Sequence, residues 1–141
     1  MSIPTLYSNV ISGLLKKSQS KQVRWNTTTD ANTFIVFFDK TSLSIRQNSR
    51  IDFNGNLEEC WIIVDLLNDL GEKVDGFVIE GNDEDWDKLD ELYTLARRAA
   101  LSIDSAIHEI ITEINKTGII GKKINNNSSN GDDSFTDDIP F

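Results

Sequence analysis

Apolar residues near the start of the chain recur with the spacing of an amphipathic helix. Pro4 suits the first turn of a helix, and Ser2 can cap it. The apolar positions that share one helical face are Ile3, Leu6, Val10, Ile11, Leu14 and Leu15. Positive charge follows at Lys16, Lys17 and Lys21, where it complements the helix dipole. We therefore predict an N-terminal helix that directs one face toward a core.

From residue 22 to residue 80 the hydrophobic period changes to two. Aromatic and β-branched residues dominate the alternating segments, as is typical of strands. The predicted strands cover residues 23–27, 34–38, 43–45, 60–67 and 76–80. Polar turn residues separate them, including Asn54-Gly55-Asn56. Because the connections are short, we predict an antiparallel meander of about five strands.

A helical period returns after residue 82 and continues to residue 114. Asn82 or Asp83 can cap this helix, and acidic residues fill its first turns. Its apolar face consists of Trp86, Leu89, Tyr93, Ala96, Ala100, Ile103, Ile107, Ile110 and Ile114, widened by Leu92, Ala99 and Ala106. We predict one continuous helix packed on the sheet, which makes the fold class α+β.

This predicted helix is longer than the sheet is wide. About 32 residues of helix span on the order of 48 Å, whereas five strands spaced by about 4.8 Å span only about 20 Å. The isoleucine-rich second half therefore needs other cover, and a second protomer is one candidate. We expect a homodimer with Ile103, Ile107, Ile110 and Ile114 as possible contact residues.

The last part of the chain has a different composition. Asn, Ser, Gly and Asp dominate residues 125–133, with almost nothing apolar to bury. Such a segment is typical of a flexible, disordered tail. We divide the chain into an α+β domain over residues 1–117 and a linker with an acidic tip over residues 118–141.

Charge is distributed unevenly along the 141 residues. The chain has 14 Lys and Arg against 23 Asp and Glu, a formal net charge of -9. Residues 1–50 carry seven basic and two acidic side chains, whereas residues 51–121 carry five basic and seventeen acidic ones. A protein that coats nucleic acid over its whole surface would be basic. Any nucleic-acid surface is therefore expected in the first third of the chain.

The sequence offers no convincing catalytic or metal-binding set. Cys60 is the only cysteine, and His108 lacks a His or Cys partner at metal-binding spacing. No serine or cysteine triad can be assembled. We expect a non-enzymatic protein without cofactor or metal. The N-terminal residues contain no apolar stretch long enough for a signal peptide, and no apolar run approaches the ~20 residues of a membrane span. We therefore expect a cytoplasmic location and no membrane partner.

The final residues of the chain combine acidic and apolar groups. Asp137 and Asp138 precede Ile139, Pro140 and Phe141, and Asp132 and Asp133 lie just upstream. A terminal Phe presents a ring and an α-carboxylate at one point, which a pocket with a basic rim can hold together. Pro140 fixes its own backbone angle and favours an extended Ile139, which lowers the cost of ordering.

This tip resembles that of the bacterial single-stranded-DNA-binding proteins. Members of that family end in Asp residues followed by Ile or Leu, Pro and Phe on a disordered linker. The resemblance covers roughly the last twenty residues and implies that Ile139, Pro140 and Phe141 dock on replication, repair and recombination proteins, with the Asp residues as an electrostatic fringe. It does not extend to the rest of the chain, which lacks the pattern of that family's OB domain.

Basic and aromatic residues alternate in the first predicted strands, as in surfaces that stack bases and pair phosphates. The possible residues for binding single-stranded DNA are Lys21, Arg24, Trp25, Phe37, Lys40, Arg46 and Arg50. The alternative is that most of the aromatic side chains form the core. Strand alternation directs Trp25 inward, and Phe37 with Ile35 is the best candidate for the opposite face.

Two functions are consistent with these patterns. The first is an accessory protein of DNA metabolism, carried by a phage or plasmid, that recruits host enzymes through its tip and binds single-stranded DNA with its sheet. The second is a decoy or adaptor that mimics the tip and occupies its pocket on such enzymes without binding DNA. The basic first third favours the first, and the acidic remainder favours the second. A structural dimer with a regulatory tail is a third interpretation, which rests on the long helix alone.

Overall fold

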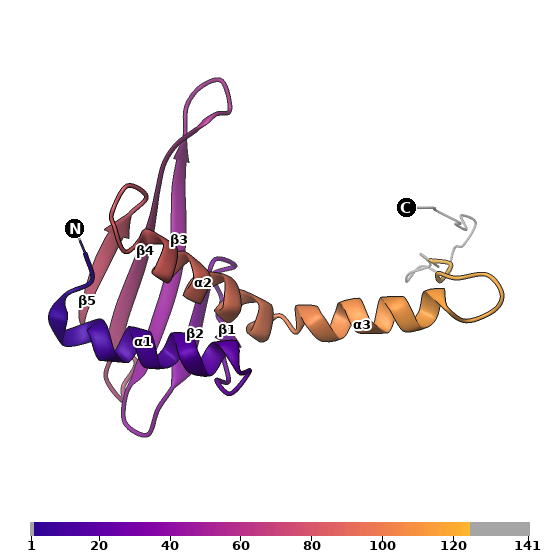
Figure 1. The fold of residues 1–141 in the computed structure, drawn as a ribbon, viewed down its shortest axis with the longest axis horizontal. Coiled ribbons are helices and arrows are strands. Elements are labelled where there is room, and N and C mark those ends of the chain that lie inside the picture. Colours follow the sequence, from indigo (N-terminus) through magenta and orange to yellow (C-terminus); the bar gives the residue numbers. More distant parts are fainter. Residues whose placement is uncertain (1, 125–141) are drawn as a thin grey trace, which may run out of the picture. The chain divides into compact units, whose positions relative to one another are not determined.

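The computed structural model describes residues 2–124 and shows an α+β protein. An N-terminal helix is followed by a five-stranded antiparallel sheet and two C-terminal helices (Figure 1), so the predicted fold class is confirmed. The described part of the chain divides into two compact units, residues 2–104 and residues 105–124. The docking residues of the tip, Asp132, Asp133, Asp137, Asp138, Ile139, Pro140 and Phe141, lie outside the described residues.

Helix α1 (Thr5–Gln19) forms as predicted but buries a different stripe. Pro4 occupies the capping position and no side chain caps the helix, so the predicted role of Ser2 is wrong. The buried residues are Tyr7, Ile11, Leu14 and Ser18. Leu6 is 84% exposed and Val10 is also exposed. The apolar face predicted from the sequence therefore splits into a buried half and an exposed half.

The strands follow one another across the sheet in chain order, as the meander prediction required. They are β1 (Asn26–Thr27), β2 (Thr33–Phe37), β3 (Ser42–Ile51), β4 (Leu57–Leu67) and β5 (Lys73–Glu80). All four pairings are antiparallel. Short connections impose this arrangement because neighbouring antiparallel strands need only a tight turn between them.

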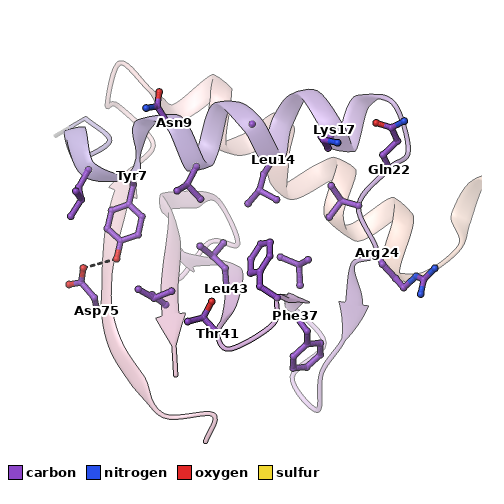
Figure 2. Close-up of a pocket in the computed structure, with 17 residues that line it drawn as sticks. Tyr7, Asn9, Leu14, Lys17, Gln22, Arg24, Phe37, Thr41, Leu43 and Asp75 are labelled. Carbon is purple, nitrogen blue, oxygen red and sulfur yellow. Dashed lines mark hydrogen bonds between the residues drawn. The ribbon is translucent and has the colours of Figure 1, made fainter. Parts of the chain in front are cut away.

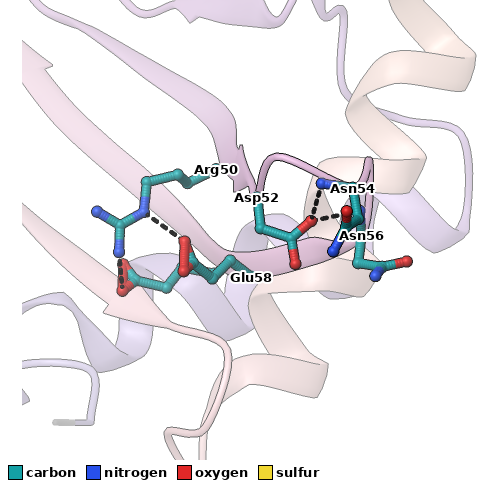
Figure 3. A network of polar contacts seen from close by, with 6 residues as sticks. Arg50, Asp52, Asn54, Asn56 and Glu58 are labelled. Atoms are coloured by element: carbon teal, nitrogen blue, oxygen red, sulfur yellow. Dashed lines mark hydrogen bonds and ion pairs between the residues drawn. The ribbon is translucent and has the colours of Figure 1, made fainter.

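The β3–β4 hairpin is longer than the sequence predicted. The pairing begins at Ser42 with Leu67 and continues to Ile51 with Leu57, with a register shift after Arg50. Its turn is stabilised by Asp52, whose Oδ1 accepts hydrogen bonds from two backbone N–H groups at 2.9 Å each (Figure 3). The second half of β3 is polar and exposed, so it lacks the hydrophobic alternation by which strands are recognised.

The core lies between one face of the sheet and the helices α1 and α2 (Trp86–Ala100), which Figure 1 shows on the same side of the strands. Helix α2 contributes Leu89, Leu92, Tyr93 and Ala96, all buried. Facing them are alternate residues of the strands, namely Phe34, Val36, Leu43, Ile45, Ile62, Val64 and Ile79. Alternation explains this set, because successive side chains of a strand point to opposite faces.

The predicted long helix is interrupted at Ser102. Helix α2 ends at Ala100, and α3 (Ile103–Ile114) begins after a break at which Ser102 has a φ of 53°. The prediction of one continuous helix is therefore wrong. Hydrophobic spacing does not reveal the break because the alternation of three and four continues across it. A left-handed residue nevertheless ends an α-helix wherever it occurs.

The acidic residues before α2 do not cap it as predicted. The helix starts after Asp85 without a side-chain cap. The Oδ2 of Asp85 instead accepts the backbone N–H of Ile3 at 2.8 Å, and the Oδ2 of Asp83 accepts that of Glu80 at 2.7 Å. Asp85 thus ties the segment before α1 to the start of α2, across more than eighty residues of sequence.

Candidate functional site: an open sheet face and a groove beneath helix α1

The residues predicted to bind single-stranded DNA do not form one surface. Trp25 is only 4% exposed, and its indole Nε1 donates a hydrogen bond to Ser18 Oγ at 3.0 Å. Its ring belongs to the core and cannot stack on a base, so the inclusion of Trp25 is wrong. Strand alternation indicates this inward direction, because Trp25 directly precedes Asn26, whose partner Ile35 lies on the opposite face of the sheet.

Two of the predicted cations are engaged with carboxylates. Lys21 Nζ lies 3.4 Å from Asp104 Oδ2. Arg50 contacts Glu58 Oε1 at 3.1 Å and Glu59 Oε2 at 2.9 Å (Figure 3). Exposed ion pairs of this kind add little stability. They do cancel the positive potential that would attract a phosphate backbone.

The other predicted residues lie at separate places. Phe37 at the end of β2 is 64% exposed, which agrees with its predicted outward direction. Arg46 lies in β3 and is partly buried. Lys40 lies in the turn between β2 and β3, and Arg24 in the connection before β1, both exposed. Only Phe37, Arg46 and Arg50 share the face of the sheet that points away from the helices.

This open face is more apolar than the sequence suggested. The strand register aligns Thr33, Arg46, Ile63 and Val78 in one row across four strands. Trp61 lies in the same face, two residues before Ile63 in β4. Residues 60–67 were predicted only as a strand, and Trp61 was not among the candidate site residues. In the structure, buried Ile62 and Val64 alternate with partly buried Trp61 and Ile63, so Trp61 points to the open face. The continuous apolar run of the sequence does not reveal this direction.

The charges of the open face are balanced. Its acidic side chains are Glu59, Asp65 and Glu80, which alternate with Trp61 and Ile63 or pair with them across strands. Lys73 Nζ lies 3.1 Å from Asp65 Oδ1, so this cation is also matched by a carboxylate. An apolar and electrically balanced sheet face is more typical of a protein contact than of a nucleic-acid surface.

A groove of about 730 Å³ lies beneath α1, on the other side of the sheet. Figure 2 shows it between the helix, the segment that leads into β1 and the end of β2. Its walls are mostly apolar and include the exposed side chains of Leu6, Val10 and Phe38. Phe37 also borders the groove, but strand alternation directs its side chain to the open face. Hydrophobic periodicity does not predict this groove, because the groove depends on how far α1 lies from the ends of the strands.

The groove has two chemically different ends. At one end the Tyr7 hydroxyl donates a hydrogen bond to Asp75 Oδ2 at 2.6 Å. At the other end Figure 2 shows Lys17, Gln22 and Arg24. Burial, followed by the hydrogen bond to Asp75, raises the pKa of Tyr7 to about 12. The same hydrogen bond is the main cause that lowers the pKa of Asp75 below its usual range.

We expect Tyr7 to titrate with a midpoint near pH 12 and at lower pH when Asp75 is replaced by asparagine. An amide removes the negative charge that opposes ionisation, while the burial remains, so the pKa should fall without reaching an ordinary value. Carbon-13 NMR of the tyrosine rings would separate Tyr7 from Tyr93. An unchanged Tyr7 pKa in the Asp75→Asn protein would show that the hydrogen bond is not formed in solution.

The second unit carries its own apolar surface. Ile107, Ile110 and Ile114 of α3 are exposed. Ile103, at the start of α3, is half-buried and belongs to the first unit. Within this unit, Ile110, Ile114 and Ile120 line a hollow of about 460 Å³. The apolar face predicted for α3 is thus present, and its role as a dimer contact remains a prediction.

Within residues 2–124, no group of three or more His, Cys, Asp or Glu side chains is placed to hold a metal ion. In the same part of the chain, no helix is long and apolar enough to cross a membrane. The chain shows no match to a family model, a curated protein or a solved structure.

Proposed function

We propose that this protein is a non-enzymatic accessory factor of DNA metabolism that docks on replication, repair or recombination enzymes through its C-terminal Ile-Pro-Phe tip. The sequence of the tip is the observation that carries this proposal. Two Asp residues, Ile139, Pro140 and Phe141 combine an apolar anchor, a stiff backbone and a cluster of negative charge. That chemistry suits a pocket with apolar walls and a basic rim.

The body of the protein is consistent with a carrier of such a tip. Its α+β core is complete over residues 1–104, with helices α1 and α2 covering one sheet face. The open sheet face, with Trp61, Ile63 and Phe37, offers a second surface for a partner. The proposed location is the cytoplasm, where the enzymes that read such tips act.

A version of the chain that lacks Phe141 tests the proposal. Its affinity for a repair exonuclease that binds the tip of single-stranded-DNA-binding proteins should fall at least about 30-fold. A buried aromatic anchor typically contributes about 2 kcal/mol or more to binding. Fluorescence anisotropy with labelled protein would measure the affinity, and a peptide of the bacterial tip should compete.

The matched control is Phe53→Ala in the β3–β4 turn, which removes a phenylalanine that is 90% exposed in the body. This variant should bind the exonuclease as the unchanged protein does. Equal affinity of the unchanged protein and the version without Phe141, for several enzymes that bind the tip, would contradict the proposal.

A decoy or adaptor that docks without binding DNA is the second candidate. It is favoured by the burial of Trp25 and by the carboxylates that pair with Lys21 and Arg50. We expect affinity for single-stranded DNA to be weak at physiological salt and little changed by Arg46→Ala. Tight binding with a steep salt dependence, lost on replacing Arg46 and Trp61, would instead support direct DNA binding by the open face.

A further inference from the structure

Helix α1 carries a second apolar stripe that the core does not use. Leu6, Val10, Gly13 and Lys17 follow one another at spacings of four, three and four, so they share one helical face. All four line the groove beneath the helix and all are exposed. Exposed leucine and valine on a helix are ordinary when isolated. Here they face further exposed apolar side chains across a concave surface, which is typical of a binding site.

The wall opposite α1 is formed by the end of β2, where Phe38 is exposed and borders the groove. The floor is one row of the sheet, in which Val36, Leu43 and Leu66 are paired across three strands. Asp75 of β5 ends this row. The groove is therefore apolar along its length, with its polar groups gathered at the two ends.

Gly13 lines the groove without a side chain of its own. A Cβ added at this residue would meet no atom within 4 Å, so packing gives no reason for a glycine. Glycine in the interior of a helix costs about 0.5–1 kcal/mol relative to alanine. A larger side chain at this position would occupy the space between Val10 and Lys17. The absence of a side chain is thus unfavourable for the helix and favourable for an occupant of the groove.

The charges at the two ends differ in sign. Lys17 and Arg24 lie at one end, and among the described residues neither side chain is in an ion pair, unlike Lys21 and Arg50. The other end is closed by the Tyr7–Asp75 hydrogen bond, which places a carboxylate there. A ligand with a single negative group is attracted to the first end and repelled by the second, so its orientation is fixed.

We propose that this groove binds an anionic amphiphile, a molecule with one aliphatic chain and one carboxylate. The chain lies among Leu6, Val10 and Phe38, over the floor formed by Leu43, and the carboxylate faces Lys17 and Arg24. A volume of about 730 Å³ lies in the range of small-molecule sites, which combine apolar walls with a few polar groups. This binding activity is independent of the C-terminal tip and of any contact with DNA.

Calorimetric titration of the full chain with sodium dodecanoate, below its micelle concentration, tests the proposal. Dodecyltrimethylammonium chloride supplies the same chain with a positive head. We expect saturable binding of one dodecanoate per chain and at least tenfold weaker binding of the cation. On addition of dodecanoate, the amide chemical shifts of Val10, Gly13 and Phe38 should change. The spectrum should remain that of a folded protein.

Two variants and one matched control locate the site. Gly13→Met should abolish dodecanoate binding while leaving the melting temperature equal or higher, because methionine has a much better helix propensity than glycine. Lys17→Glu should weaken binding at least tenfold. Lys16→Glu, which makes the same charge change at an exposed residue that does not line the groove, should leave binding unchanged.

Three results would overturn the proposal. The first is equal binding of the anionic and cationic amphiphiles. The second is unchanged dodecanoate binding by a folded Gly13→Met protein. The third is an absence of dodecanoate binding by a protein that sediments with the mass of a dimer, where Gly13→Met restores the mass of a monomer. That result would show that a second copy of the chain occupies the groove.

Discussion

Replacing Gly76 by alanine is expected to destabilise the protein by about 2–3 kcal/mol, a large effect for a single methyl group. Gly76 lies in β5 and pairs with Asp65 of β4. A Cβ at this position would lie 2.5 Å from the carbonyl oxygen of Val64 and 3.2 Å from Cα of Asp65. Because these are backbone atoms of the neighbouring strand, no side-chain rotation relieves the overlap. The β4–β5 pairing must therefore move apart.

The same substitution at Gly13 is the control, and we expect the opposite sign. No atom lies within 4 Å of a Cβ at Gly13. Alanine there should stabilise α1 by about 0.5–1 kcal/mol through helix propensity. Urea unfolding followed by circular dichroism would measure both free energies of unfolding. Equal effects of the two replacements would show that the β4–β5 contact around Gly76 is looser than the structure indicates.

Replacing Leu92 by alanine should lower the free energy of unfolding by about 3 kcal/mol or more. Leu92 lies in α2 and is fully buried against the sheet. Truncation removes its transfer free energy and leaves a cavity, and such changes typically cost about 2–5 kcal/mol. Domains of this size are stable by only about 5–15 kcal/mol. The variant should therefore unfold at a much lower urea concentration.

Leu6→Ala in α1 is the matched leucine truncation, because Leu6 is 84% exposed. It should change the free energy of unfolding by less than about 0.5 kcal/mol. Similar losses for the two variants would mean that Leu6 is covered in solution. Because Leu6 is part of the wall of the groove beneath α1, such a result would also indicate that the groove is occupied.

Much of the fold is predictable from the sequence because local patterns determine it. Helix α1, the order of the strands and the core face of α2 all follow from hydrophobic periodicity and short connections. The break at Ser102 is not predictable in this way, since the apolar spacing passes through it unchanged. The polar half of β3 is also missed, because backbone pairing with β4 and the Asp52 turn hold it rather than burial.

The candidate site is less predictable because it depends on tertiary position. Alternation places Phe37 outward and Trp25 inward, and the structure agrees with both. Periodicity groups Leu6 and Val10 with Ile11 and Leu14, since all lie within one broad apolar face. Only the position of α1 over the sheet decides which half of that face is covered. The groove, and the location of Gly13 in its lining, follow from that position.

The hydrogen bond between the N–H of Ile3 and Asp85 has a consequence for synthesis on the ribosome. The meander can pair as it emerges, because each strand contacts the one made just before it. The first helix, by contrast, packs beside α2, which is translated some eighty residues later. Until α2 has been translated, α1 is the only helix that can cover the apolar face of the nascent sheet. The interval between translation of β5 and of Ala96 is therefore the period in which a chaperone would protect this chain most.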